Sequence, residues 1–283
     1  MVQSYSVYIH IPFCRHRCSY CDFNTYAGIE YLIPDYVQSL CHEIRYVCST
    51  VGERLQVHTI YFGGGTPSLL PPGELEKIFT CLHQQFLILE GVEISLEANP
   101  GTLSLSYMRD IKSMGVNRIS LGMQSAQLQD LRLLERQHDY SDVVQSVRWA
   151  RLSGFENINL DLIFGIPYQS MESWRRTLEL ALSLHPAHFS LYALTLEQDT
   201  PLGNWVRRGL VSPVDDDLAA DMYEFSSEAL DRAGFVHYEI SNWAGRDRLG
   251  STWACRHNLQ YWRSLPYLGF GAGAHGYANQ TRT

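Results

Sequence analysis

Short β-rich segments alternate with amphipathic helical segments along most of the chain, and this alternation constrains the fold more than any other feature. The β-rich runs cover residues 6–11, 57–62, 92–98, 116–123, 157–164 and 189–194. Between the second and third runs, residues 74–86 have one apolar stripe, formed by Leu75, Ile78, Phe79, Leu82 and Phe86. Strands joined by helices form a parallel sheet, so the pattern predicts an α/β fold.

The predicted strands have one apolar face and one polar face. Residues 92–97 carry apolar side chains at even positions and polar ones at odd positions, and residues 158–162 alternate in the same way. Strands of an open parallel sheet are covered by helices on both faces and read as continuously apolar. A polar face instead indicates a sheet that curves around a site. We therefore expect a partial, six-stranded (βα)6 barrel.

Composition and charge exclude several classes of protein. Apolar residues make up 45% of the 283 residues, and the net charge of -8, without any basic stripe, argues against a nucleic-acid partner. The N-terminus enters the first strand without a leader segment, and no run reaches the roughly 18 apolar residues that span a bilayer. Seven cysteines without a leader fit a reducing compartment. We expect a cytoplasmic protein, with a peripheral membrane contact left open.

Cys14, Cys18 and Cys21 form a C-x3-C-x2-C run directly after the first predicted strand. Three thiolates can hold a 4Fe-4S cluster while leaving one iron open to an outside ligand. A zinc site needs four ligands, and no second C-x2-C pair follows, although His16 could be the fourth. A thioredoxin-like redox pair would leave Cys14 unexplained. The spacing favours the cluster, and zinc or redox use stays open.

Three other cysteines lie on predicted helices and are expected to pack in the core. Cys41 and Cys48 belong to an apolar series with helical spacing, and Cys81 lies on the stripe-bearing helix. Free cysteine packs as a small hydrophobic residue, so these thiols need no chemical role.

Polar side chains gather where the predicted strands end. Glu97 closes the third strand, Gln124 follows the fourth and Asp161 lies late in the fifth. Sites in parallel α/β folds form at this edge, where the cysteine loop also opens. The second strand leads into GGGTPS at residues 63–68, whose glycines allow close backbone approach to a ligand and present N–H groups to a carboxylate. A GGG turn alone is weak evidence, and its place beside the cysteine loop strengthens it.

Several motifs in this order resemble the radical S-adenosylmethionine (SAM) superfamily. They are YIHIPFCRHRCSYCDFN, IYFGGGTPSLL, ISLEANPGT, GVNRISLGMQS, INLDLIFGIP and GFGAGAHG, spread from about Tyr5 to Tyr277. More narrowly, they are similar to oxygen-independent coproporphyrinogen III oxidases and their relatives. The resemblance implies a 4Fe-4S cluster that binds and reductively cleaves SAM. It also implies a radical SAM barrel over residues 1–235, with residues 236–283 starting a C-terminal α+β region.

The resemblance assigns roles to particular residues. It makes Cys14, Cys18 and Cys21 the cluster ligands. Around SAM it places Tyr8, Tyr20, Gly64, Gly65, Thr66, Glu97, Gln124, Arg136 and Asp161. The chemistry agrees, because a carboxylate can pair with an ammonium or accept from ribose hydroxyls, and a guanidinium can clamp a carboxylate. From the residues alone, Arg136 would be a surface charge after a leucine-rich helix.

Two departures from the oxidase pattern favour its heme-chaperone branch. Phe23 stands where the oxidases have a fourth cysteine, and only thirteen residues precede Cys14, where the oxidases have an extended arm. RHNLQYW, at residues 256–262, carries the HNxxYW signature of the HemW-type heme chaperones. The resemblance therefore implies heme as a further ligand, heme-accepting apo-proteins as partners and an electron donor.

The HNLQYW segment is expected to contact heme. If it is helical, His257 and Tyr261 lie one turn apart on one face, with Trp262 beside them. A neutral imidazole can ligate heme iron and flat aromatic rings can stack on the macrocycle. His257 is thus the candidate axial ligand, and Cys255 is a second candidate close by. In isolation, such a cluster is more typical of a hydrogen-bonded core element.

The C-terminal third carries two further expectations. Asp215, Asp216 and Asp217 precede a predicted helix that runs to about residue 233, where acidic residues complement the helix N-terminus without a catalytic role. Family members continue beyond GAHG into a small helical region, so the resemblance implies a truncated or divergent chain at Thr283.

Three functions remain open from the sequence. A heme chaperone is favoured by Phe23 and HNLQYW. A coproporphyrinogen oxidase would act through a 5'-deoxyadenosyl radical. A redox or zinc module would use no organic cofactor.

Overall fold

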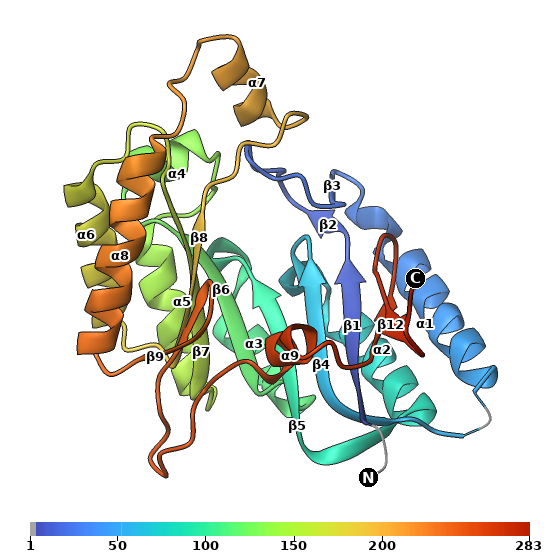
Figure 1. The fold of residues 1–283 in the computed structure, drawn as a ribbon. Helices are drawn as coiled ribbons and strands as arrows, with labels where there is room; N and C mark the ends of the chain where they lie inside the picture. The colour runs from blue at the N-terminus through green and yellow to red at the C-terminus, as the bar shows by residue number, and fades with distance from the viewer. Residues whose placement is uncertain (1–3, 52) are drawn as a thin grey trace.

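One long curved sheet, with helices on its outer side, forms the body of the molecule (Figure 1). The computed structural model describes residues 4–51 and 53–283. The sheet has the strand order β13-β12-β11-β1-β4-β5-β6-β7-β8-β10-β9. Its central parallel strands are β1 (Ser4–Ile11), β4 (Gln56–Gly64), β5 (Leu87–Ala98), β6 (Arg118–Gln124), β7 (Asn157–Phe164) and β8 (His188–Ala193). These are the six predicted strands, with ends that differ by a few residues at most positions, so the α/β prediction is confirmed.

Residues near the C-terminus extend both edges of this sheet. β11 (Tyr267–Phe270) runs parallel to β1, and β12 (Tyr277–Ala278) and β13 (Thr281–Arg282) continue outward in antiparallel pairs. At the other edge, β10 (Asn242–Ala244) pairs antiparallel with β8 and carries β9 (Val236–Glu239). The boundary at 235/236 stays a prediction, and the residues after it belong to the same sheet as the barrel strands.

The helices lie mainly on the outer, apolar face of the sheet, except for the last one, which crosses its open inner side (Figure 1). They are α1 (Ile33–Ser49), α2 (Pro72–Gln85), α3 (Leu105–Ser113), α4 (Leu128–Leu133), α5 (Tyr140–Leu152), α6 (Met171–Ser183), α7 (Pro201–Arg207), α8 (Asp216–Arg232) and α9 (Arg256–Trp262). Three 3-10 turns cover Glu30–Leu32, Pro67–Leu69 and Pro100–Thr102. Within the described ranges, no helix is both long and apolar enough to cross a membrane.

Two local predictions about helices are confirmed. Cys41 and Cys81 are buried in the core between α1 and α2, and Cys48 packs against it from the end of α1. Asp215 caps α8 by accepting a hydrogen bond from the backbone N–H of Leu218 at 3.0 Å. This contact satisfies one free N–H of the first helical turn, as expected for an acidic residue at a helix N-terminus.

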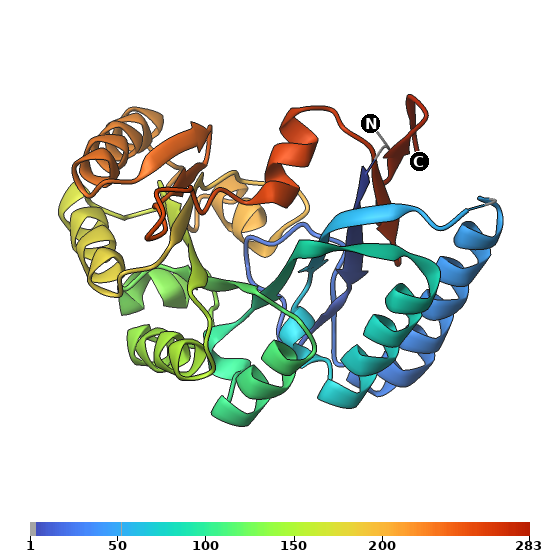
Figure 2. The same ribbon diagram turned by 90° about the horizontal axis from the view of Figure 1, so that it is seen from below.

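The inner face of the sheet is polar and yet buried. Its buried polar residues include Ser6, Thr59, Ser95, Arg118, Ser120, Asn159, His188 and Ser190, each 3% exposed or less. Figure 2 shows why, since the sheet curves into an open C and α9 lies across the gap between its two edges. The alternating strands therefore predicted the curvature correctly.

Glu93 fastens α9 to the inside of the sheet. Its carboxylate, on β5, accepts hydrogen bonds from the backbone N–H groups of Arg256 and His257, both at 3.1 Å. The Cys255 thiol donates to the same carboxylate at 3.5 Å, and the Arg256 guanidinium reaches the carbonyl of Gly91 at 2.7 Å. A carboxylate at a helix N-terminus complements the helix dipole, so Glu93 stabilises α9 where it crosses the barrel.

We predict that Glu93→Ala lowers the free energy of unfolding by roughly 2–4 kcal/mol, because it leaves buried N–H groups without an acceptor. Urea unfolding followed by circular dichroism measures the change. Glu90→Ala, an exposed position on the same strand, is the control and should change stability by less than about 0.5 kcal/mol. Equal effects of the two substitutions would contradict this role of Glu93.

Candidate functional site

The cysteine loop is held between the first strand and two helices on the far side of the barrel. Cys14 ends the short strand β2 (Phe13–Cys14), which pairs with β3 (Tyr26–Ala27). The backbone N–H of Ser19 donates to the carbonyl of Leu134, after α4, at 3.3 Å. The carbonyl of Ser19 accepts from the N–H of Leu202, in α7, at 2.8 Å. These bonds place the loop at the carboxyl edge of the parallel strands, as predicted.

Each of the three thiols in the loop has a polar side chain beside it, and for Cys21 this is the Thr25 hydroxyl, 4.0 Å from Sγ. The Thr66 hydroxyl donates to Cys14 Sγ at 3.6 Å, and Arg136 Nη1 donates to Cys18 Sγ at 3.5 Å. Burial raises the pKa of the Cys14 and Cys21 thiols. A bound cation would offset that effect, because metal ligation takes the thiolate form.

The donor set fits a cluster better than a single zinc ion. In a 4Fe-4S cluster each thiolate binds a different iron, so the three sulfurs need not converge on one point. Nowhere in residues 4–51 and 53–283 do three His, Cys, Asp or Glu side chains converge as one bound ion requires. His16, the candidate fourth zinc ligand, has its Nε2 3.7 Å from a Glu135 carboxylate oxygen.

The glycine turn, residues 63–65, is hydrogen-bonded to the chain just before the cysteine loop. The N–H of Gly65 donates to the carbonyl of Ile11, and that of Thr66 to the carbonyl of Phe13, both at 2.8 Å. Gly64 has a φ of +111°, and a Cβ there would lie 2.5 Å from the His10 ring. The glycines are therefore required for close approach to β1 and to the segment that follows it. The sequence predicted close approach to a ligand, which the structure does not test.

Two carboxylates face the interior above the buried polar wall. Glu97 accepts from the Tyr61 hydroxyl at 2.8 Å and from the N–H of Gly64 at 3.2 Å. Asp161 accepts from Asn159 Nδ2 at 2.7 Å and from the Ser120 hydroxyl at 2.9 Å. Burial, followed by the neighbouring Asp161, raises the pKa of Glu97 to about 7. This pair could bind an ammonium group and ribose hydroxyls of a ligand.

Arg136 is not the solvated surface charge that its local sequence predicts. It is half-buried, and its Nη2 donates to the carbonyl of Gly122 at 2.9 Å and to the Asn99 side chain. Asn99 Nδ2 in turn donates to the Thr66 hydroxyl at 3.0 Å. The Nε of Arg136 is buried and has no acceptor among residues 4–51 and 53–283. This free donor fits a ligand carboxylate, as the family resemblance implied.

Three more predicted residues lie around the same edge. Gln124 ends β6 with a φ of +62°, a left-handed conformation that is uncommon for residues other than glycine and that clusters at functional sites. Tyr8, on β1, donates or accepts through its hydroxyl with His10 Nδ1 at 3.1 Å. Tyr20 packs with an apolar cluster that includes Leu134. The structure thus brings the predicted SAM residues to one end of the barrel.

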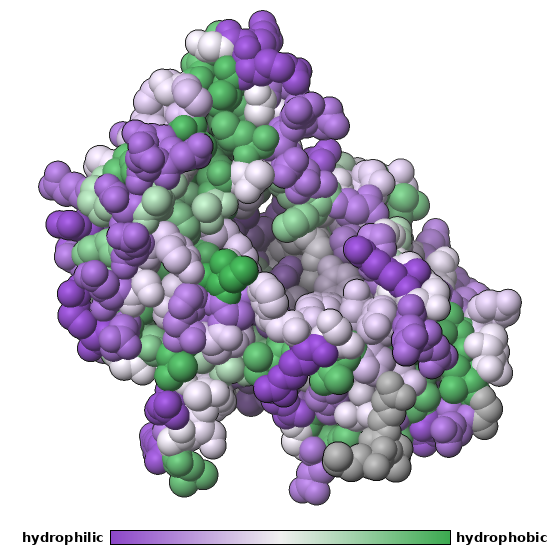
Figure 3. Space-filling model, viewed as in Figure 1, coloured by the Kyte–Doolittle hydropathy of each residue, from purple (hydrophilic) through white to green (hydrophobic). Residues whose placement is uncertain are grey.

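A pocket of about 390 Å³ connects this edge with α9 and the C-terminal loop. It is lined by Tyr8, His10, Phe23, Asn24, Gly64, Glu97, Tyr261, Tyr267, Gly273, His275 and Arg282. The space-filling view shows the molecule hollowed near its centre, with hydrophilic residues on the floor (Figure 3). Sequence reasoning missed His10, Asn24, Tyr267, His275 and Arg282. His275 belongs to the GFGAGAHG motif, which was recognised without a role for its histidine.

The HNLQYW segment is helical, which meets the condition on which the placement of His257 and Tyr261 depends, but its histidine points into the protein. His257 is 1% exposed, and its Nδ1 lies 2.9 Å from the Thr59 hydroxyl. Its Nε2 lies 2.9 Å from the Tyr261 hydroxyl, and burial lowers the pKa of His257 to about 3. Tyr261 lines the pocket and His257 does not. Axial ligation by His257 stays a prediction, as does a link through the fully buried Cys255.

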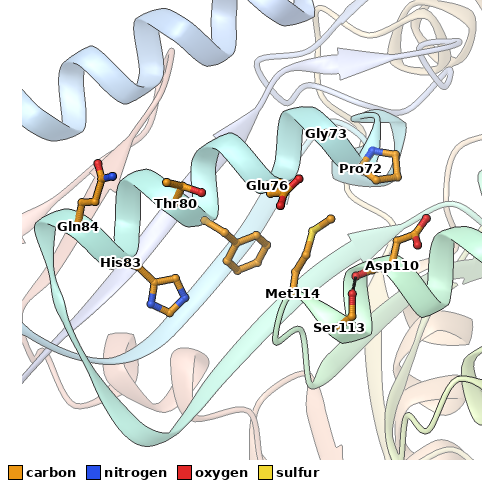
Figure 4. Close-up of a pocket in the computed structure, with 10 residues that line it drawn as sticks. Pro72, Gly73, Glu76, Thr80, His83, Gln84, Asp110, Ser113 and Met114 are labelled. Carbon is orange, nitrogen blue, oxygen red and sulfur yellow. Dashed lines mark hydrogen bonds between the residues drawn. The ribbon is translucent and has the colours of Figure 1, made fainter.

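A larger hollow of about 730 Å³ lies elsewhere, between α2 and α3. Figure 4 shows Glu76 and Met114 facing each other across it. Its lining includes none of the cysteine-loop or cradle residues. Volume alone therefore does not mark the candidate site, because the cradle residues Gly64 and Glu97 line the smaller pocket.

Comparison with known families agrees with this geometry. The model of the radical SAM superfamily matches residues 8–181, which include the cysteine loop, the glycine turn, Glu97 and Asp161. The chain belongs to the radical SAM superfamily. The superfamily implies a 4Fe-4S cluster and SAM, and the three thiols, the two carboxylates and the free Nε of Arg136 fit those groups.

Curated relatives narrow the placement within the radical SAM superfamily. The chain is 42% identical to heme chaperone HemW of Synechocystis over 98% of its length and 67% of that protein. It is 39% identical to heme chaperone HemW of Escherichia coli, over 96% of this chain and 69% of that one. The chain thus spans about two thirds of the length of these relatives.

Among solved structures, coproporphyrinogen III oxidase from Escherichia coli has the same fold. The TM-score is 0.84 at 23% identity, covering 97% of this chain and 65% of the oxidase. At this identity the likeness concerns the fold, and it confirms the radical SAM barrel.

We predict that Cys14→Ala abolishes the visible iron–sulfur absorbance after anaerobic reconstitution, because the cluster loses a ligand. Iron and sulfide analysis measures the loss. Cys48→Ala, on α1, is the matched control and should keep full iron and sulfide. Stoichiometric iron and sulfide in the Cys14 variant would show that the ligand set is wrong.

The pKa of Glu97 generates a second prediction. The carboxyl group of Glu97 binds its proton more tightly in the folded protein than in the unfolded chain. Protonation of Glu97 therefore stabilises the fold, fully below about pH 4.5, and this stabilisation is lost as the pH rises through about 7. Glu97→Gln should remove on the order of 3 kcal/mol of this pH dependence of unfolding. Urea unfolding at several pH values between 4.5 and 8 measures it, with Glu90→Gln as control. An unchanged pH profile in the Glu97 variant would contradict the assignment.

Proposed function

We propose that this chain is a heme chaperone that binds heme and delivers it to apo-proteins. One observation carries the proposal: the chain is about 40% identical, over nearly its whole length, to proteins named heme chaperone HemW. The geometry supports it, since one pocket adjoins both the carboxylate cradle and Tyr261 of the HNLQYW helix.

In this proposal the barrel edge holds the resident cofactors. Cys14, Cys18 and Cys21 hold a 4Fe-4S cluster, which when bound supplies an open iron for exchangeable SAM. Glu97 and Asp161 accept from the ammonium group and ribose hydroxyls, since both carboxylates face the interior. Arg136 binds the carboxylate through its free Nε. Thr66, Gly64, Gly65, Gln124, Tyr8 and Tyr20 complete the cradle.

Coproporphyrinogen oxidation is the second candidate function, and the presence of Phe23 argues against it. The family pattern of the oxidases has a fourth cysteine at this position. Here the position is held by the apolar side chain of Phe23, which is 65% exposed and lines the pocket. The solved oxidase shares the fold at 23% identity, which carries no claim about activity.

The partners follow from the proposed activity. Delivery requires heme-accepting apo-proteins, and cluster reduction requires an electron donor. We place the protein in the cytoplasm because all seven cysteines are unpaired thiols, which suits a reducing compartment.

We predict saturable heme binding by the anaerobically reconstituted protein and no SAM-dependent protoporphyrinogen formation from coproporphyrinogen. A heme titration followed by absorbance and a porphyrinogen assay on the same preparation measure the two activities. Protoporphyrinogen formation would contradict a function as a chaperone alone. Absence of saturable heme binding would overturn the proposal altogether.

A further inference from the structure

We propose that Asn99 is a positioning residue for the iron–sulfur cluster, and that it sets the reduction potential of the cluster through a chain of hydrogen bonds that ends on Cys14 and Cys18. This inference rests on the proposed ligand set, because it assigns donors to two of the proposed cluster thiolates. Asn99 lies in the ISLEANPGT motif, two residues after Glu97 of the proposed SAM cradle.

The local sequence determines where the Asn99 side chain lies. Pro100 confines the residue before it to an extended backbone, and Asn99 has a φ of −91° and a ψ of 131°. Asn99 therefore continues the alternation of β5, and its side chain is on the same side of the sheet as that of Glu97. This places the amide group at the carboxyl edge, beside the cysteine loop.

Arg136 determines which way round the Asn99 amide is held. A guanidinium can only donate, so the side-chain oxygen of Asn99 has to face Arg136 Nη2. The amide nitrogen, Nδ2, then donates to the Thr66 hydroxyl at 3.0 Å. Because this hydroxyl oxygen accepts from Asn99, its own hydrogen is left for Cys14 Sγ, which lies 3.6 Å away. The direction of each bond from Arg136 to Cys14 thus follows from the positive charge of the guanidinium.

The same guanidinium completes the chain on a second sulfur. Arg136 Nη1 donates to Cys18 Sγ at 3.5 Å, and Nη2 also donates to the carbonyl of Gly122 at 2.9 Å. A Cβ at Gly122 would lie 3.1 Å from Nη2 and 3.5 Å from the Asn99 side-chain oxygen, so glycine leaves the space in which the two side chains meet. One connected network therefore supplies donors to two of the three thiols.

Donors to the sulfur atoms affect the reduction of a cluster. Hydrogen bonds to the sulfurs and nearby positive charge stabilise the reduced, more negative form of an iron–sulfur cluster, which raises its reduction potential. Burial strengthens such bonds, and Thr66 is only 2% exposed and Cys14 only 8% exposed. We therefore expect the network to make the cluster easier to reduce than it would be without these donors.

The backbone of Asn99 already holds the turn in place. Its N–H donates to the Ser68 hydroxyl at 3.4 Å, and its carbonyl accepts from the Thr102 hydroxyl at 2.7 Å. The side chain instead bonds to Arg136 and Thr66. A substitution of the side chain can therefore alter the network while these backbone contacts persist.

The test measures the midpoint potential of the cluster by EPR-monitored redox titration of the full chain, reconstituted anaerobically. Asn99→Asp should keep full iron and sulfide but shift the potential to a more negative value. The carboxylate offsets the charge of Arg136 and accepts the hydroxyl hydrogen of Thr66 that otherwise bonds to Cys14. Thr66→Val removes that hydroxyl without adding charge and should shift the potential in the same direction. Gln38→Glu, at an exposed amide on α1, is the control and should keep the wild-type potential.

A double-mutant comparison tests whether Asn99 acts through Thr66. In the Thr66→Val background, Asn99→Asp should shift the potential by less than it does in wild type, because the hydroxyl that the carboxylate would take from Cys14 is gone. Equal shifts in the two backgrounds would overturn the proposed chain of hydrogen bonds.

The outcomes separate this inference from the ligand set on which it rests. If wild type assembles a cluster and both single variants keep its potential, the inference is wrong and the ligand set stands. If Asn99→Asp loses iron and sulfide, Thr66→Val provides the test, and an unchanged potential in that variant would overturn the inference. If wild type assembles no cluster, the ligand set and the inference are both overturned. Circular dichroism of each variant confirms that it is folded.

Discussion

The burial of a polar sheet face is the constraint on which the rest of this structure depends. A buried polar group without a partner costs free energy, so the inner wall has to satisfy itself or hold a ligand. Asn159 illustrates a wall residue that is satisfied within the protein. Its side-chain amide donates to Ser120 and Asp161, and its side-chain oxygen lies 2.6 Å from His188 Nδ1. Glu93 shows the same principle at α9. Glu97 and Arg136, near the carboxyl edge, retain capacity for a ligand.

Segments far apart in the chain become one site because the strands place them at one edge. The glycine turn after β4 holds the end of β1 through Ile11, and the loop after β11 is bonded to Asn24 of the cysteine-loop segment. The pocket between them contains Glu97 of the cradle and Tyr261 of α9. In the proposed function this adjacency places a SAM-binding edge and a heme-binding pocket in direct contact, so occupancy of one can affect the other.

Local pattern predicted the parts of the fold that depend on periodicity. The six parallel strands and the apolar stripe of α2 follow from spacing alone. The added edge strands did not, because β9 to β13 are two to four residues long and are held by pairing with distant strands. The surroundings of the Arg136 and His257 side chains could not be predicted from local sequence either. Whether a side chain is buried, and which nitrogen is engaged, depends on neighbours that are distant in the sequence, such as Asn99 after β5 and Thr59 on β4.

The central claim is that heme and the iron–sulfur cluster occupy adjoining sites at the carboxyl edge of the barrel. Iron-edge anomalous diffraction from crystals of the reconstituted, heme-loaded protein tests it most directly. Iron density is expected for a cluster at Cys14, Cys18 and Cys21 and for a separate single iron near Tyr261 of α9. A single iron in any other place, such as the hollow between α2 and α3, would contradict it.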